Sequence, residues 1–156
     1  MKNYRQHGTI NCFEHSFNVA YYSYKIAKFL KLDYKSLTRG AMLHDFFLYD
    51  WRDTKDILPK GFFNMHAFSH GKIAYNNASK LFKLNDIEKE VIIKNMWPVT
   101  ISLPKYKETY IITLADKYST LKEMIDPIMN KIMKSEMYNL LLCFIYLIVV
   151  TYDNYL

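Results

Sequence analysis

The chain has 156 residues, of which 51% are hydrophobic and 17% aromatic, with only 4 glycines and 4 prolines. This composition argues against a disordered or low-complexity protein, and the length suits a single domain over residues 1–156 with a substantial core. The formal net charge of +6 is compatible with a phosphorylated ligand or a nucleic acid, but the lysines are scattered and solvated helix faces give the same count.

Helix signals begin early in the chain, whereas strand signals are almost absent. Asn11 and Glu14 form a capping-box pattern, which predicts a helix whose apolar stripe is His15, Val19, Tyr22, Ile26 and Phe29. Asp33 predicts the cap of a second helix, and the pair His44-Asp45 falls late in that helix. The first half of the chain is therefore expected to be helical.

In the middle of the chain, Pro59 and the residues around it predict a polar connection between helices. His66 and His70 stand four residues apart, so on a helix they share one face. A second capping-box pattern at Asn85 predicts a further helix that stops before Pro98.

The last third is expected to contain two helices. Pro104 suits the first turn of a long helix that reaches about Ile125 and contains Asp116, and Pro127 is expected to interrupt it. An apolar helix follows from Ser135. The whole pattern predicts an all-α fold, a single compact bundle of about five to seven helices.

Cysteine usage and the apolar runs bear on the compartment. Cys12 and Cys143 form no CxxC pair, which favours free thiols in a reducing compartment. The first residues lack the apolar core of a secretory signal, and the apolar run 140–150 is shorter than the about 20 residues that a membrane-spanning helix needs. We expect a cytoplasmic protein without a membrane span, in which this run forms a buried terminal helix; the alternatives are peripheral contact with a membrane or a surface for a partner.

Four polar residues interrupt apolar, helix-like stretches: His15, His44, Asp45 and Asp116. Burial of imidazoles and carboxylates costs free energy unless something binds them, and a divalent metal satisfies both kinds of group together. The alternative is that each histidine is a core residue hydrogen-bonded to a carbonyl or carboxylate. The residues point to a metal site assembled from distant helices.

In this order, and together with His70, these residues resemble the HD-domain superfamily of metal-dependent phosphohydrolases, and in particular a bacterial HD-domain group. The resemblance spans most of the chain. It is carried by Gln-His-Gly, Glu-His-Ser-x-x-Val-Ala, Leu-His-Asp-Phe-Phe-Leu-Tyr-Asp-Trp, His-x-Phe-x-His, Met-Trp-Pro and Ala-Asp-Lys-Tyr.

The resemblance implies one or two divalent ions, with iron, manganese, zinc, cobalt and nickel all compatible with mixed histidine and aspartate ligands. The implied ligands are His15, His44, Asp45 and Asp116, with His70 and His66 as candidates for a second ion and Asp45 as the bridging carboxylate. Related sequences often carry histidine directly before Met-Trp-Pro, where this chain has Asn95. A neutral amide is a poorer ligand than imidazole, so the second ion stays open.

The implied activity is hydrolysis of a small phosphorylated compound, with a nucleotide as the first choice, by attack of metal-bound hydroxide on phosphorus. Asp45 is then catalytic through the metal, and Lys117 is a candidate to neutralise phosphate charge. Four further residues are candidates for substrate binding: His7, Trp51, Arg52 and Lys72. Each has an ordinary structural alternative, because lysines usually face solvent and aromatic residues usually pack in the core.

Three other functions compete with this interpretation. A non-catalytic HD domain would bind a nucleotide or a metal without turnover, and Asn95 supports this alternative. A di-iron centre could activate oxygen instead of hydrolysing a phosphate. A nucleic-acid-binding module is not expected, because no basic cluster is interleaved with aromatic residues. The oligomeric state stays open.

Overall fold

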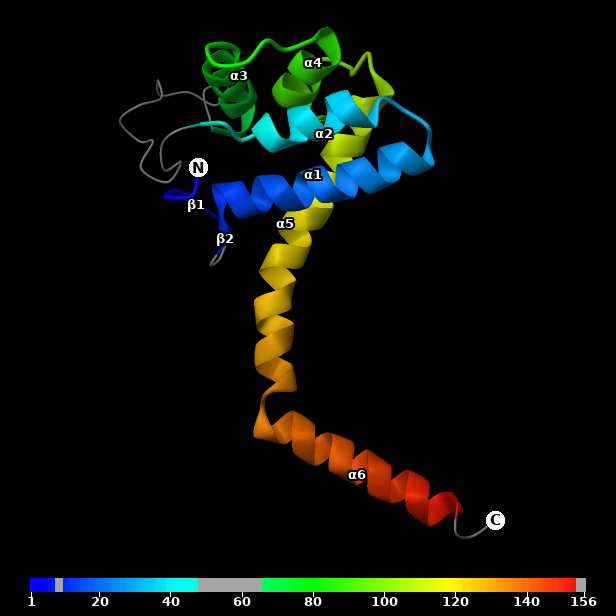
Figure 1. Ribbon diagram of the computed structural model, residues 1–156. Coiled ribbons are helices and arrows are strands. Elements are labelled where there is room, and N and C mark those ends of the chain that lie inside the picture. The colour runs from blue at the N-terminus through cyan, green and yellow to red at the C-terminus, as the bar shows by residue number, and fades with distance from the viewer. Residues whose placement is uncertain (8–9, 48–65, 154–156) are drawn as a thin grey trace. The chain divides into compact units, whose positions relative to one another are not determined.

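The computed structural model describes residues 1–7, 10–47 and 66–153, and the statements below concern those residues (Figure 1). They form six helices, which confirms the predicted all-α fold. The elements are β1 (Arg5–His7), β2 (Ile10–Asn11), α1 (Cys12–Phe29), α2 (Tyr34–Leu43), α3 (His66–Ser79), α4 (Asp86–Lys94), α5 (Lys107–Met133) and α6 (Glu136–Asp153). The chain divides into two compact units, Met1–Leu121 and Lys122–Leu156, which are described separately.

The starts of two helices follow the predicted capping boxes. At α1 the Asn11 side chain accepts a hydrogen bond from the Glu14 backbone, and the Glu14 side chain accepts one from the Asn11 backbone. Asn85 and Glu88 repeat this arrangement at α4. Such a cap contributes about 1 kcal/mol, which is why the start of each helix is legible in the sequence.

The second helix begins as predicted but ends earlier. Asp33 caps α2 by accepting a hydrogen bond from the backbone of Ser36. The helix then stops at Leu43, with His44 as its C-cap residue. His44 keeps helical backbone angles as the C-cap residue, and Asp45 lies just past the helix end rather than inside it.

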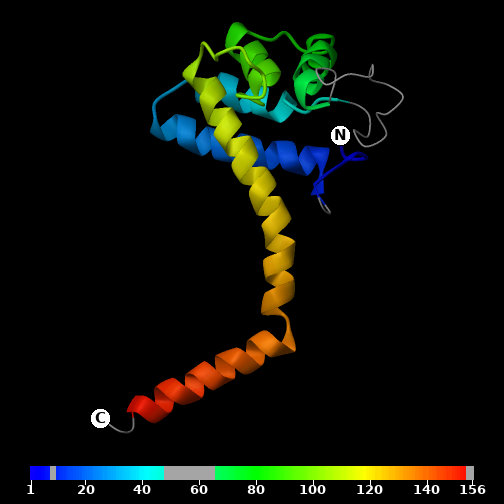
Figure 2. The ribbon, with the colours of Figure 1, turned by 180° about the vertical axis from the view of Figure 1, so that it is seen from behind.

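The core of the first unit lies between α1, α2, α4 and the first half of α5. Figure 1 shows α2 between α1 on one side and α3 with α4 on the other, and the reverse view in Figure 2 shows the first half of α5 crossing α1. The buried apolar side chains are Val19, Ala20, Ala27, Leu37, Ala41, Val91, Ile111, Ile112 and Ala115. Small residues on α1 and α2 let these helices approach closely, and this brings their polar residues near one another.

Glycine has a similar effect between α3 and α4. A Cβ atom added at Gly71 would lie 2.7 Å from the Ile93 carbonyl oxygen and 2.8 Å from that of Ile92. Only glycine allows the two backbones to be this close. The contact fixes the position of the preceding residue, His70, against the end of α4.

The structure corrects three predictions about secondary structure and packing. Pro127 lies inside α5, which continues to Met133, so the proline does not interrupt that helix. The chain also has two short antiparallel strands, β1 and β2, that the sequence did not indicate. On α1, the predicted apolar stripe departs from the buried face toward its end, because Phe29 is 85% exposed while Ala27 is buried.

The second unit holds the end of α5 and the apolar helix α6. Within this unit the apolar side chains of α6 between Met137 and Ile148 are exposed, Leu140 to 70%. The unit by itself does not bury them, contrary to the expectation of a buried terminal helix. Among the described residues, none of the helices has the length and apolar character needed to cross a bilayer.

Candidate metal centre

Three helices bring together side chains that are far apart in the sequence. His15 comes from the first turn of α1, His44 from the end of α2 and Asp116 from the middle of α5. One ligand atom of each lies within 4.8 Å of the others, and all three side chains are buried. Together with Asp45, which is also buried, we call them the histidine–aspartate cluster.

The nitrogen and oxygen atoms of the histidine–aspartate cluster face one another. The His15 Nε2 atom lies 3.0 Å from Asp116 Oδ1, and the His44 Nε2 atom lies 3.8 Å from the same oxygen. Asp45 Oδ2 lies 3.5 Å from His44 Nε2 and 3.9 Å from His15 Nε2. Two imidazoles and two carboxylates therefore surround one small volume from several sides.

The tautomer of His44 follows from its other ring nitrogen. Nδ1 lies 2.7 Å from the Ala41 carbonyl oxygen, which can only accept, so Nδ1 carries a hydrogen. In the neutral imidazole the Nε2 lone pair then faces two carboxylates. This buried Nε2 atom has no hydrogen-bond partner among the described residues. A hydrogen-bond donor or a cation would satisfy this atom, and a bound cation would also neutralise the two carboxylates that face it.

The pKa values point to the same demand for positive charge. Burial lowers the pKa of His44, but the charge of Asp45 and the proximity of Asp116 outweigh it, so the pKa is raised above its ordinary value. Burial raises the pKa of Asp116, but interactions with His15 and His44 outweigh burial and hold the pKa well below its usual range. The carboxylates attract positive charge strongly into a buried volume.

This donor set fits a divalent cation. Imidazole nitrogens and carboxylate oxygens are common ligands of first-row transition metals. A ligating imidazole usually donates its other ring N–H to a group such as a backbone carbonyl, as His44 does here. The unpartnered His44 Nε2 atom would gain a partner, and the mutual repulsion of the two carboxylates would be neutralised. His15, His44 and Asp116 are the residues placed to hold the ion, with Asp45 beside them.

Two residues from the first elements of the chain hold Asp45. Gln6 in β1 donates its side-chain amide to Asp45 Oδ2 at 2.6 Å. The Cys12 thiol donates to the Asp45 backbone carbonyl at 3.1 Å, and burial followed by the charge of Asp45 raises the pKa of this thiol to about 12. Cys12 is therefore a protonated donor at neutral pH. Sequence reasoning missed Gln6, although it belongs to the Gln-His-Gly stretch that the resemblance singled out.

The other oxygen of Asp45 faces a different pair of residues. Asp45 Oδ1 lies 3.8 Å from His70 Nε2, and His70 Nε2 lies 3.2 Å from the side-chain nitrogen of Asn95. We call these two residues the His70–Asn95 pair. Both side chains are buried, at 5% and 1% exposure. The structure thus places the sequence-predicted ligand His70 beside the cluster, in contact with Asn95.

The remaining predicted site residues are placed only in part. The Lys117 ammonium donates to the Trp97 backbone carbonyl at 2.9 Å, and Lys72 is exposed on α3. For His7 in β1 and His66 in α3 the backbone is described but the side chains are not. Trp51 and Arg52 lie outside the described residues. Their roles stay predictions.

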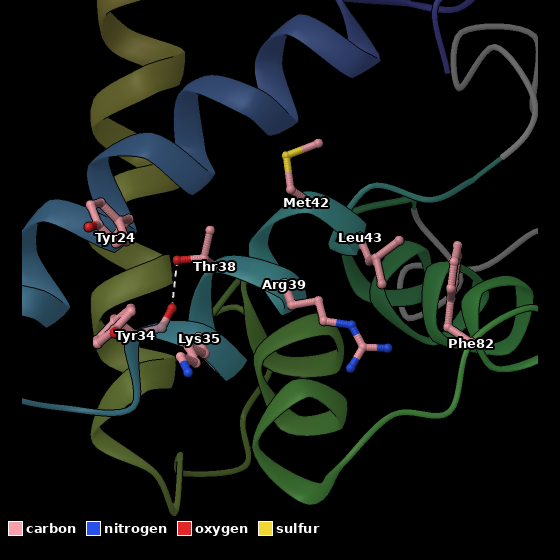
Figure 3. A pocket seen from close by; sticks show the side chains of 8 residues that line it. All are labelled: Tyr24, Tyr34, Lys35, Thr38, Arg39, Met42, Leu43 and Phe82. Carbon is pink, nitrogen blue, oxygen red and sulfur yellow. Dashed lines mark hydrogen bonds between the residues drawn. The ribbon is translucent and has the colours of Figure 1, made fainter.

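A separate surface pocket of about 520 Å³ lies along the outer face of α2 (Figure 3). It is lined by Tyr24, Tyr34, Lys35, Thr38, Arg39, Met42, Leu43 and Phe82. Arg39 is engaged by the Glu88 carboxylate at 3.0 Å and by the Lys83 carbonyl at 3.0 Å. The pocket shares no lining residue with the histidine–aspartate cluster, and sequence reasoning did not predict it.

Comparison with known proteins identifies the family. Residues 12–121 match the sequence model of the HD domain, so the chain belongs to the HD domain family, which places it in a superfamily of metal-dependent phosphohydrolases. The match ends where the first compact unit ends, at Leu121. No curated protein and no solved structure matches the chain. That the 156 residues form one domain stays a prediction.

Proposed function

We propose that this protein is a metal-dependent phosphohydrolase that acts on a small phosphorylated compound, a nucleotide in the first place. The observation that carries the proposal is the convergence of His15, His44 and Asp116, with Asp45 beside them, in a buried volume. Membership of the HD domain family supports the same reaction class.

A divalent ion in the cluster would lower the pKa of a bound water and neutralise charge on the phosphoryl oxygens. The residues of the chain prepare the site for that ion. The Ala41 carbonyl fixes the His44 ring, and Gln6 fixes the Asp45 carboxylate. Such outer contacts hold the ligands in position before the ion binds, which strengthens metal affinity.

The choice of a phosphorylated substrate rests on charge. The chain carries a formal net charge of +6, which favours the approach of an anion. Lys72 and Lys117 are candidates to bind phosphate, and the predicted stacking residue Trp51 favours a substrate with a nucleobase.

A second candidate function is a non-catalytic HD domain that binds a nucleotide or a metal. The buried Asn95 amide favours it, because an amide stands next to His70 where related sequences often have an imidazole. Nucleotide binding without turnover would distinguish it from the hydrolase.

The test is a phosphate-release assay on the full chain, purified without a metal-binding tag and supplied with Mn²⁺, Fe²⁺, Co²⁺ or Ni²⁺. The panel contains nucleoside mono-, di- and triphosphates, a sugar phosphate and p-nitrophenyl phosphate. We expect phosphate release from at least one nucleotide. Release from the sugar phosphate alone would keep the hydrolase and reject the nucleotide.

Asp116→Asn supplies the matched loss of function. It should reduce turnover by more than about 100-fold, because even substitutions next to a metal ligand cost about 10- to 100-fold. Asp126→Asn makes the same chemical change on the same helix at an exposed ion pair with Lys122 and should leave turnover unchanged. Equal turnover in both variants would contradict the proposed site.

A further inference from the structure

The two oxygens of the Asp45 carboxylate define two sides of the site. Oδ2 faces His15 and His44 in the histidine–aspartate cluster, and Oδ1 faces His70 at 3.8 Å. A bridging carboxylate with one histidine on its far side is half of a second metal position. Two metals bridged in this way lie about 3.5–4 Å apart in hydrolytic centres.

The far side is occupied by a hydrogen bond within the protein. Asn95 is 1% exposed, and its side-chain nitrogen lies 3.2 Å from His70 Nε2, the atom of His70 that faces Asp45. When the amide nitrogen donates, the Nε2 lone pair is used. When the amide is turned so that its oxygen accepts, Nε2 must carry the hydrogen. In either orientation His70 Nε2 is engaged by Asn95.

The backbone holds the His70–Asn95 pair together. Gly71, the neighbour of His70, lies against the carbonyl groups of Ile92 and Ile93, close to the end of α4. Asn95 caps that same helix end. Because the two helices are already in backbone contact, the position of the His70–Asn95 pair is set by the packing of α3 against α4.

The two sides of the Asp45 carboxylate also differ in how strongly they attract a positive charge. In the histidine–aspartate cluster the buried His44 Nε2 atom faces two carboxylates without a hydrogen-bond partner. On the far side the donors that the described residues supply are one imidazole, one shared carboxylate oxygen and a neutral amide. An amide is a weak ligand for a transition metal, so three neutral or shared donors do not offset the cost of dehydrating a second ion.

We infer that this chain holds a single divalent ion, in the histidine–aspartate cluster, and that the His70–Asn95 pair excludes a second ion. The inference rests on the proposed function, because it presupposes that the cluster binds a metal. Asn95 is then a specificity-determining residue for metal number, and Asn95→His should convert the site to one that binds two ions.

The test uses the full chain, stripped of metal, loaded with Mn²⁺ and freed of excess. Elemental analysis counts the ions, and electron paramagnetic resonance separates an isolated Mn²⁺ from a spin-coupled pair. We expect about one ion per wild-type chain with an isolated signal, and about two ions with a coupled signal in Asn95→His. Asn76→His, the same substitution at an exposed position of α3, should stay at one ion.

The outcomes separate the inference from the proposed function. Two coupled ions in the wild type would overturn the inference and leave the metal-dependent reaction standing. No ion in the wild type after loading would remove the proposed metal site itself. A folded Asn95→His variant that still binds one ion would also overturn the inference. If that variant does not fold, the wild-type count and signal decide.

Discussion

The two oxygens of Asp45 share one carboxylate but lie in different surroundings. On the side of Oδ2, buried histidines and Asp116 create a strong demand for positive charge. On the side of Oδ1, His70 is matched by a neutral amide. The comparison shows that proximity of histidine and carboxylate does not by itself make a metal site. What decides is whether the nitrogen lone pairs are left for an ion or used within the protein.

The largest expected effect on metal binding comes from removing one histidine on each side of the Asp45 carboxylate in turn. His44→Ala should abolish Mn²⁺ binding and phosphate release together, because it removes a ligand that faces both carboxylates. His70→Ala should keep about one ion per chain, since His70 is engaged by Asn95. Elemental analysis of both variants, with circular dichroism to confirm unchanged helical content, makes the comparison. Equal loss of metal in both would mean that the two sides act as one centre.

The next effect concerns the residue that holds the shared carboxylate. Gln6→Ala removes the 2.6 Å hydrogen bond to Asp45 Oδ2 and should weaken Mn²⁺ affinity by about 10- to 100-fold. Titration of the metal-free chain with Mn²⁺ measures the change. Gln6→Glu offers a matched probe, because a carboxylate in place of the amide donor would repel Asp45. A Gln6→Ala variant with wild-type affinity would show that Asp45 needs no support from β1.

The backbone contact behind the His70–Asn95 pair can be broken separately. Gly71→Ala would place a methyl group against the Ile92 and Ile93 carbonyl groups and should lower the free energy of unfolding by about 1–3 kcal/mol. Asn76→Ala on the exposed side of the same helix should stay within about 0.5 kcal/mol of the wild type. Urea unfolding measures both. If Gly71→Ala were as stable as Asn76→Ala, the close approach of α3 and α4 would not exist in solution.

The smallest effect concerns Glu90, which ties the helix of Asn95 to the helix of Asp116. Its Oε1 atom accepts hydrogen bonds from the backbone of Lys105 at 2.7 Å and of Tyr106 at 3.0 Å, and from the Thr109 hydroxyl at 3.0 Å. Burial raises the pKa of Glu90, but the hydrogen bonds from Tyr106 and Lys105 outweigh it and lower the pKa below the ordinary 4.5.

Because the folded pKa of Glu90 is depressed, its contribution to stability is fully present above pH 4.5 and is lost as the pH falls through the folded value. Glu90→Gln should therefore lower the free energy of unfolding by about 0.5–1.5 kcal/mol at pH 7, and the difference from the wild type should shrink below pH 4.5. Urea unfolding at pH 7 and pH 3.5 measures it. A difference that is the same at both pH values would contradict the role of the charge.

Local features of the fold were legible in the sequence. The capping boxes at Asn11 and Asn85 lie within four residues, so they predicted the starts of α1 and α4. Pro127 misled because a proline in a helix interior is costly, yet α5 continues through it. The end of α2 before His44 also differed, since the hydrophobic pattern continues past the last residue of the helix, Leu43.

The candidate site was predictable in its residues but not in its contacts. The order of histidines and aspartates along the chain, which resembles that of the HD-domain superfamily, singled out His15, His44 and Asp116. The structure brings these three residues together. The hydrogen bond from Gln6 to Asp45 spans 39 residues, and the contact of Asn95 with His70 spans 25. No local pattern encodes such pairs, because they depend on how the helices pack. Asn95 was singled out by the resemblance, whereas its partner was visible only in the fold.

The central claim is that one side of Asp45 holds the ion and the other does not. Anomalous X-ray diffraction from crystals of the Mn²⁺-loaded full chain tests it most directly, because the signal locates each ion relative to named side chains. We expect one strong peak within coordination distance of His15, His44 and Asp116. A second peak of similar strength between His70 and Asp45, or a single peak beside His70, would contradict it.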